Sequence, residues 1–277
     1  MSAKAKVLTA VLLVSVFCIG LAGGYFGAYF VSNKDISSDS DMASDEEGKS
    51  VKEQDSKKEI DFTDIVTDAF CKTVPYEYGE YSYRIPQLNY DGNGVDEFNK
   101  KMYDELYALY TDSEKEAVNL GGEPELAEIK YIWYHTDDVI SIVAGTRKTM
   151  YHDPQFYIYN FSLSEEKELS KTDIIENEGY TEESFNSKVR DAVQKETDNI
   201  LEKNYLSSGV DTSQSYSEAI ESTLSDERVN QAVTFYNDKG ELCVVTYVFS
   251  LGGASMYRHI INLETGTDAC DFECGNK

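Results

Sequence analysis

The sequence predicts an α+β fold, in which helices pack on an antiparallel sheet, with two subdomains of similar size after one N-terminal transmembrane helix. Three observations lead to this prediction. An uncharged run of 25 residues lies near the N-terminus, amphipathic helical segments are few, and short alternating segments typical of strands fill much of the remaining chain. A doubly wound parallel sheet would need a helix after nearly every strand, so the antiparallel arrangement fits this order better.

The uncharged run covers residues 7–31, and about 20 such residues suffice to cross a bilayer core. Lys4 and Lys6 precede the run, whereas acidic residues follow it. Residues 1–6 are therefore expected in the cytoplasm and the C-terminal region outside the cell. A cleaved signal peptide is the alternative, but the run continues well beyond the weak cleavage site at 20–22. The sequence thus favours a single-pass protein of the cell membrane.

The chain beyond the membrane helix is strongly acidic. Residues 32–60 are rich in Ser, Asp, Glu and Lys, and we expect a flexible acidic stalk there. Residues 61–277 hold 18 Lys and Arg against 42 Asp and Glu, a net charge of −24. Such a surface repels nucleic acid and anionic lipid headgroups but attracts basic proteins. The charge excludes nucleic acid as a partner and fits a cationic protein, although solubility alone also accounts for it.

The first subdomain is expected over residues 61–167. The alternating segment 76–88 predicts a strand that ends at Pro86. A turn at 89–94 then leads into an amphipathic helix of about four turns, with Asn93 as its N-cap. The apolar face of this helix consists of Val95, Phe98, Met102, Leu106 and Leu109. Three further strands are expected at residues 128–134, 139–143 and 156–163.

The second subdomain is expected over residues 168–277. Its first helix has Thr181 as N-cap, and Tyr180 and Phe185 occupy the positions of a hydrophobic staple. Residues 216–224 suggest a second, shorter helix. The strands that follow are expected at residues 232–236, 242–249 and 257–263. A turn of Asn, Asp, Lys and Gly joins the first two of these strands and is the clearest hairpin signal in the chain.

Four cysteines follow the membrane helix, and an exported location permits disulfides. Four cysteines allow three pairings, and the sequence does not choose among them. The last two lie close to the C-terminus, where a stapled tail fits better than zinc, because no further Cys or His pair is near them. No metal or cofactor is predicted. The four cysteines are Cys71, Cys243, Cys270 and Cys274.

A search for catalytic residues favours a protein that is not an enzyme. The segment 253–257 begins like a nucleophile elbow but lacks the second glycine that such a tight turn requires. The three histidines, His135, His152 and His259, form no metal-binding pair of the H-x-x-x-H kind. The turn at 91–93 starts like a calcium loop, but the ligands expected after it are missing.

The 21 tyrosines are the remaining unusual feature. Tyrosine is enriched where proteins or sugars bind, because it combines apolar area with a hydroxyl group. Tyrosine is also an ordinary residue of strands, and core packing accounts for most of these positions. His152 lies in an expected loop before a Tyr-rich strand. The candidate binding residues are therefore Tyr151, His152, Tyr157 and Tyr159.

Short motifs between about residues 72 and 263 resemble a known pair of extracytoplasmic domains. The motifs are 83–88, Asn99, 141–143, 152–154, 159–163, 168–170 and 173–175. They are similar to the paired domains of RsiV-like anti-sigma factors, which sense lysozyme, and of PdaC-like peptidoglycan deacetylases, both from Gram-positive bacteria. Met150 and Tyr151 depart from the family, which has small residues there, and 242–263 follows the family pattern less well.

The resemblance implies a noncatalytic module that faces the cell envelope. Sigma regulation and deacetylation are not implied, because only six residues precede the membrane helix and no deacetylase domain is recognisable. We therefore expect a binding or sensing module whose partner is a cationic, lysozyme-like protein or cell-wall glycan. The alternatives are a cell-wall modifying hydrolase that uses carboxylates or His152, and a purely structural envelope protein.

Overall fold

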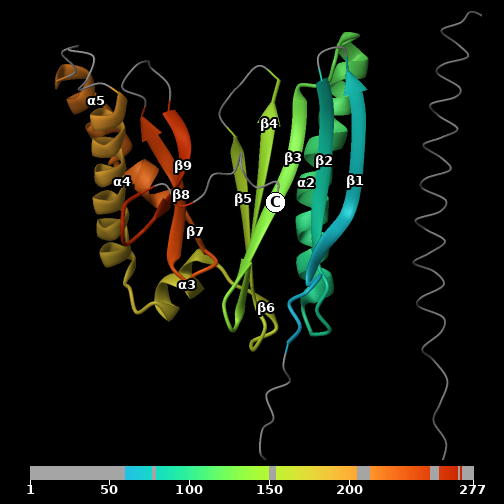
Figure 1. The fold of residues 1–277 in the computed structure, drawn as a ribbon, viewed down its shortest axis with the longest axis horizontal. Helices are drawn as coiled ribbons and strands as arrows, with labels where there is room; N and C mark the ends of the chain where they lie inside the picture. Colours follow the sequence, from blue (N-terminus) through green and yellow to red (C-terminus); the bar gives the residue numbers. More distant parts are fainter. Residues whose placement is uncertain are drawn as a thin grey trace, which may run out of the picture. The chain divides into compact units, whose positions relative to one another are not determined.

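A computed structural model describes the chain from residue 60 onward, within one compact unit that spans Glu59–Lys277. It combines a six-stranded sheet, a three-stranded sheet and helices, which confirms the predicted α+β class (Figure 1). The predicted membrane helix at 7–31, and the stalk up to residue 59, lie outside the described residues. Within the described part, no helix has both the length and the apolar character needed to cross a bilayer. The described residues are 60–76, 79–149, 154–204, 213–249, 256–267 and 269.

The larger sheet is mixed, so the prediction of an antiparallel sheet is wrong for one of its strand pairs. Strands β2 and β3 run parallel, whereas all other neighbours in this sheet are antiparallel. The parallel pair arises because helix α2, Val95–Leu120, crosses between these two strands. The strands in spatial order are β1 (Val66–Tyr76), β2 (Gly79–Leu88), β3 (Leu126–His135), β4 (Val139–Lys148), β5 (Gln155–Ser162) and β6 (Lys167–Glu168).

The first hairpin differs from the predicted single strand at 76–88. Strand β2 covers most of the predicted strand, but it pairs antiparallel with β1, Val66–Tyr76, which has no counterpart in the prediction. Pro86 lies inside β2 and not at its end. Its partner is Asp68, beside an irregularity in the register between Asp68 and Phe70, and a bulge of this kind accommodates a proline within a sheet.

Helix α2 has 26 residues, so it is longer than the four turns predicted. Its N-cap is Gly94 with φ 72°, and not Asn93. Asn93 instead donates from its backbone and its side-chain nitrogen to the Glu166 carboxylate, which ties the helix start to the turn before β6. A Cβ atom at position 94 would lie 2.6 Å from the Glu166 carbonyl oxygen, so both the backbone conformation and the space require glycine.

The second half of the described chain agrees closely with the prediction. The Oγ1 atom of Thr181 accepts a hydrogen bond from the Ser184 amide at 3.2 Å, and the rings of Tyr180 and Phe185 lie 6.4 Å apart. The short helices α3 and α6 have no predicted counterpart. The elements are α3 (Lys171–Asn177), α4 (Glu182–Asn204), α5 (Ser213–Thr223), α6 (Asp226–Asn230), β7 (Val233–Tyr236), β8 (Leu242–Phe249) and β9 (Met256–Asn262).

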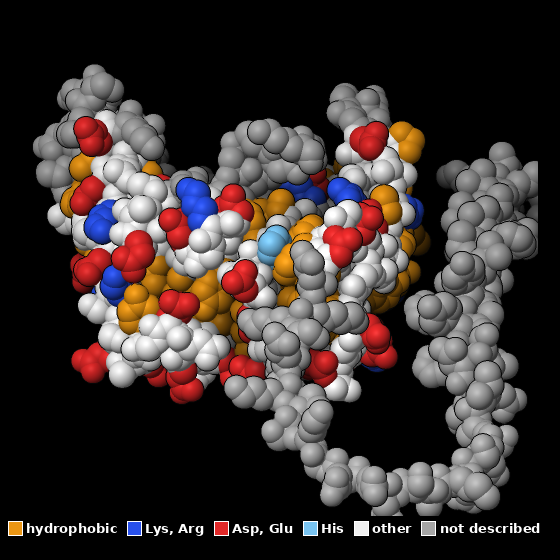
Figure 2. Space-filling model, turned by 60° about the horizontal axis from the view of Figure 1, so that its bottom comes forward, with side chains coloured by type: hydrophobic (Ala, Val, Ile, Leu, Met, Phe, Trp, Pro, Cys, Tyr) orange, Lys and Arg blue, Asp and Glu red, His pale blue; other side chains and the backbone are white. Residues whose placement is uncertain are grey.

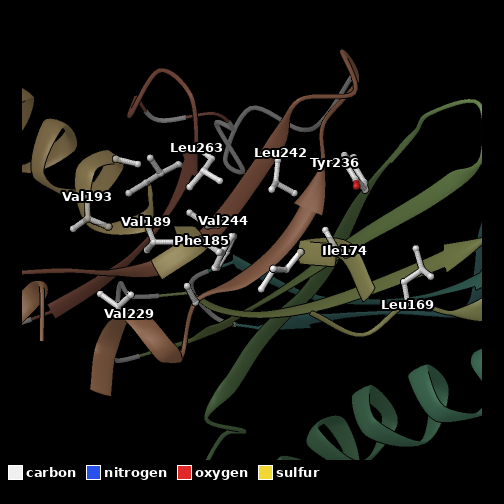
Figure 3. Packing of buried hydrophobic residues seen from close by; sticks show 14 of the residues in the cluster. Leu169, Ile174, Phe185, Val189, Val193, Val229, Tyr236, Leu242, Val244 and Leu263 are labelled. Atoms are coloured by element: carbon white, nitrogen blue, oxygen red, sulfur yellow. The ribbon is translucent and has the colours of Figure 1, made fainter. Parts of the chain in front are cut away.

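The two sheets pack against each other, and each has helices on its other face. Helix α2 covers one face of the larger sheet, and the opposite face of β3, β4 and β5 meets the smaller sheet. The smaller sheet packs its remaining face on α3, α4 and α6 (Figure 3). The cluster between the sheets contains Val143, Phe235, Cys243, Val245 and Ile260, with Ile132, Tyr134, Phe156 and Ile158 packed against it.

Buried hydrogen bonds fix the register of one sheet on the other. The Ser141 hydroxyl donates to the Asn160 side chain at 2.7 Å and accepts from the Tyr236 amide at 3.1 Å. Asn160 in turn donates to the Thr234 carbonyl oxygen at 2.9 Å. The chain passes between the sheets after Glu168, close to the predicted boundary, but the division into two subdomains stays a prediction.

Candidate functional site

The predicted binding residues that the structure describes are Tyr157 and Tyr159, whereas Tyr151 and His152 lie outside the described residues. Tyr159 is 2% exposed, and its hydroxyl donates to the Glu105 carboxylate of α2 at 2.9 Å. Burial raises the pKa of Tyr159 strongly, and it also raises the pKa of the partly exposed Tyr157, both reinforced by the charge of Glu105. Both side chains contribute to packing between β5 and α2, and their role in binding stays a prediction.

The motifs behind the family resemblance have structural roles in the described chain. Asn99 accepts from the Leu88 amide at 2.7 Å and donates to the Leu88 carbonyl oxygen at 2.8 Å, which holds α2 against the end of β2. Ser170 and Asp173 form a capping box at the start of α3. Ser141 and Asn160 lie between the sheets, so these motif residues all contribute to the architecture, whereas His152 and Asp153 lie outside the described residues.

The described histidines and cysteines do not form a catalytic or metal centre. His259 of β9 has its Nδ1 atom 3.6 Å from the buried Glu196 carboxylate of α4, whereas His135 is exposed at the end of β3. Cys71 is exposed on β1 and Cys243 is buried between the sheets, so these two are not joined to each other. Within the described ranges, no group of three or more His, Cys, Asp or Glu is arranged to hold a metal ion.

Strand β3 contains a partly exposed stretch at residues 131–134, as β5 does at residues 155–158. It pairs with β2 only at Ser82–Glu128 and Tyr83–Ile129, and past Ile129 the described residues pair it with β4 alone. Residues 131–134 are all partly exposed. Tyr131 and Trp133 pack against the core on the α2 side, whereas Ile132 and Tyr134 pack against the cluster between the two sheets. The β2–β3 pairing therefore ends beside aromatic side chains of β3 that are only partly buried.

One end of this stretch is tied to the first hairpin. The Tyr131 hydroxyl donates to Asp68 of β1 at 2.9 Å, and the Arg84 guanidinium lies 5.2 Å from the centre of the Tyr131 ring. Arg84 also donates to both carboxylate oxygens of Asp68 at 3.2 Å. Burial and the bond to Asp68 raise the pKa of Tyr131 to about 12, so its hydroxyl is a donor at neutral pH and not a base.

The other end of the stretch is an aromatic stack. Phe62, which precedes β1, lies parallel to His135 with 3.9 Å between ring centres, and the Trp133 ring centre is 6.0 Å from that of His135. Phe62 and Trp133 are partly exposed, and Trp133 is the single tryptophan of the chain. We call Phe62, Tyr131, Trp133 and His135 the aromatic strip.

Exposed carboxylates lie close in sequence to the residues of the stacked end of the strip. Asp61 and Asp64 flank Phe62 in the sequence, and Asp137 follows His135. The neighbouring Asp138 accepts hydrogen bonds from the Ser164 amide and the Ser162 hydroxyl, so it serves the turn after β5. Figure 2 shows hydrophobic side chains open to view, with both acidic and basic side chains among them, on the face turned toward the reader. The segments that carry the stack are themselves acidic.

The aromatic strip contains residue types that are enriched in binding sites. Trp, Tyr and Arg are the residues most enriched where binding energy concentrates, and the strip and its partner Arg84 supply all three. The sequence analysis did not identify the strip, because Phe62 and His135 are far apart in the chain. One signal was available: Tyr131, Trp133 and His135 alternate in a predicted strand, which places them on one face.

A scan against protein-family models and a search of curated proteins both give no significant match. The resemblance to RsiV-like domains therefore stays a prediction that depends on the short motifs. Function has to be argued from the aromatic strip and from the charge of the chain.

Proposed function

We propose that this chain is a noncatalytic binding or sensing module on the outer side of the cell membrane, and that its partner is a basic protein of the lysozyme kind. The observation that carries the proposal is the partly exposed Trp133 beside Tyr131 and Arg84. Large side chains of this kind anchor protein interfaces when a partner removes them from water.

The charge of the chain supports a basic partner. Residues 61–277 carry −24, and opposite charges accelerate the encounter of two proteins over distances comparable to the screening length. Burial of the aromatic rings then slows dissociation, because the rate of leaving depends on buried anchors more than on charges at the rim. The charge therefore acts on the association rate, and the aromatic strip acts on the dissociation rate.

Two features favour a role without catalysis. The sequence lacks a complete nucleophile motif, and the described tyrosines with shifted pKa values are shifted upward, away from the range of a general base. Polar groups near the strip are committed to each other, since Asp68 accepts from both Arg84 and Tyr131. The hydrolase reading would need groups outside this cluster, such as His152.

The test uses the full chain in detergent micelles, immobilised by its C-terminus. A basic lysozyme should bind, and the same enzyme with its lysines acetylated should bind far more weakly, because its fold is kept while its charge is lowered. Peptidoglycan fragments are added in a parallel experiment. Turnover of these fragments that disappears on His152→Ala would establish the hydrolase alternative, and binding of the fragments without any binding of lysozyme would establish a glycan partner.

A further inference from the structure

We infer that the stacked end of the aromatic strip receives a Lys or Arg side chain of the partner over the faces of Trp133 and Phe62. The inference rests on the proposed function, because it names the chemistry by which a basic partner is held. It goes further in assigning one place on the chain and one kind of contact.

The geometry offers aromatic faces to a cation. Phe62 and His135 are stacked with an interplanar angle of 10°, and Trp133 lies beside His135 at 31°. The face of an aromatic ring carries partial negative charge, and tryptophan attracts cations most strongly among the aromatic side chains. Phe62 and Trp133 are partly exposed, so a side chain from another molecule has access to them.

The two ends of the strip differ in whether a cation is already present. Arg84 lies over the ring of Tyr131 at 5.2 Å, so that ring is occupied from within the chain. In the described part of the chain, no Lys or Arg lies over Phe62 or Trp133. The stacked end therefore offers aromatic rings, as the Tyr131 end does, but within the described residues it lacks an internal cation such as Arg84.

The charges near the stack favour a cation over a neutral sugar. The segments 60–66 and 133–140 contain four aspartates and no lysine or arginine. A cation over the rings gains from the ring faces and from the charge of these carboxylates, whereas an uncharged saccharide gains only hydrogen bonds from its hydroxyls to them. A ring stack with an acidic surround is the arrangement by which proteins select ammonium groups.

The experiment uses the emission of Trp133 as its readout, because no second tryptophan contributes. The full chain in detergent is titrated with tetralysine, with the same peptide acetylated on all its amines, and with the neutral sugar chitotetraose. We expect a saturable change of emission with tetralysine that weakens as salt is raised from 0.1 to 1 M, since screening shortens from about 10 Å to about 3 Å. The acetylated peptide and the sugar should leave the emission unchanged.

Two substitutions locate the contact. Phe62→Leu keeps the fluorescent residue and removes one ring, so tetralysine should bind about two- to five-fold more weakly, as expected for a cation on an exposed ring. Tyr103→Leu is the matched control, because Tyr103 is also a partly exposed, stacked ring, but on α2. This control should leave the affinity unchanged, and melting curves of both variants show whether the fold is kept.

Each outcome decides between the inference and the proposed function. If lysozyme binds the full chain but tetralysine leaves Trp133 emission unchanged, or Phe62→Leu binds as well as the unaltered chain, the inference is wrong and the proposed function stands. If lysozyme does not bind at all, both fail. A change of emission with chitotetraose equal to that with tetralysine would assign the stack to sugars and overturn the inference.

Discussion

Strands β3 and β5 of the larger sheet have similar sequences but different surroundings. Both place aromatic side chains at every second position: Tyr131 and Trp133 in β3, and Tyr157 and Tyr159 in β5. Tyr159 is 2% exposed beneath α2, whereas Tyr157 and both β3 residues are partly exposed. Trp133 lies where β3 no longer pairs with β2, since that pairing ends at Ile129 in the described residues. The exposure of an aromatic side chain in this sheet therefore depends on what lies beside it.

The largest expected effect is on stability at β5. Tyr159→Ala removes a fully packed ring and leaves Glu105 without its donor, so we expect a loss of about 3–5 kcal/mol in the free energy of unfolding, measured by urea titration. Tyr159→Phe keeps the ring and should lose about 1 kcal/mol. A loss below about 1 kcal/mol for the alanine variant would contradict the assignment of Tyr159 to the core.

The converse effect is expected at β3. Trp133→Leu removes a partly exposed ring, so affinity for a basic protein should fall about 30-fold, which is typical of an interface anchor. Its stability should change by less than the Tyr159→Ala loss, since the ring is not enclosed. Trp133→Phe serves as the matched control and should retain most of the affinity. If calorimetry gives the same affinity for the basic protein with the unaltered chain, Trp133→Leu and Trp133→Phe, then Trp133 is not part of the interface.

A smaller effect concerns pH at the other end of the strip. The pKa of Tyr131 is raised to about 12 in the folded chain, against about 10 for an unperturbed tyrosine. The folded state therefore holds this proton more tightly than the unfolded state, so the resulting stability is complete below about pH 10 and is lost as the pH rises toward 12.

The matched variant for this effect is Tyr131→Phe, which lacks the titrating group. Its stability should fall less between about pH 10 and 12 than that of the unaltered chain, as followed by urea unfolding across this range. Parallel curves for the two chains would show that the Tyr131 hydroxyl ionises in the same range in the folded and unfolded states.

The sequence predicted elements that depend on local signals and missed features that depend on distant contacts. The Thr181 cap, the Tyr180–Phe185 staple and the hairpin around residues 237–240 are local, and the structure confirms them. Helix α3 also has a local signal, because Ser170 and Asp173 have the spacing of a capping box.

The features that the sequence could not supply are pairings between distant segments. The parallel pairing of β2 with β3, and its early end, depend on how α2 crosses the sheet. Gly94 is the cap of α2 because of Glu166, which is remote in sequence. The alternating pattern predicted Tyr157 and Tyr159 as binding residues. The partial exposure of Trp133 depends on distant pairings, so it could be seen only in the structure.

The central claim is that β3, and not β5, is the binding face, and hydrogen exchange of the full chain with and without a basic lysozyme tests it most directly. We expect the partner to slow exchange in 130–136 and 60–66, where the aromatic strip lies, and to leave 155–162 unchanged. Lysozyme with acetylated lysines should produce no such protection. Slower exchange confined to 150–162, with 130–136 unaffected, would contradict the account and return the site to the residues around Tyr151 and His152.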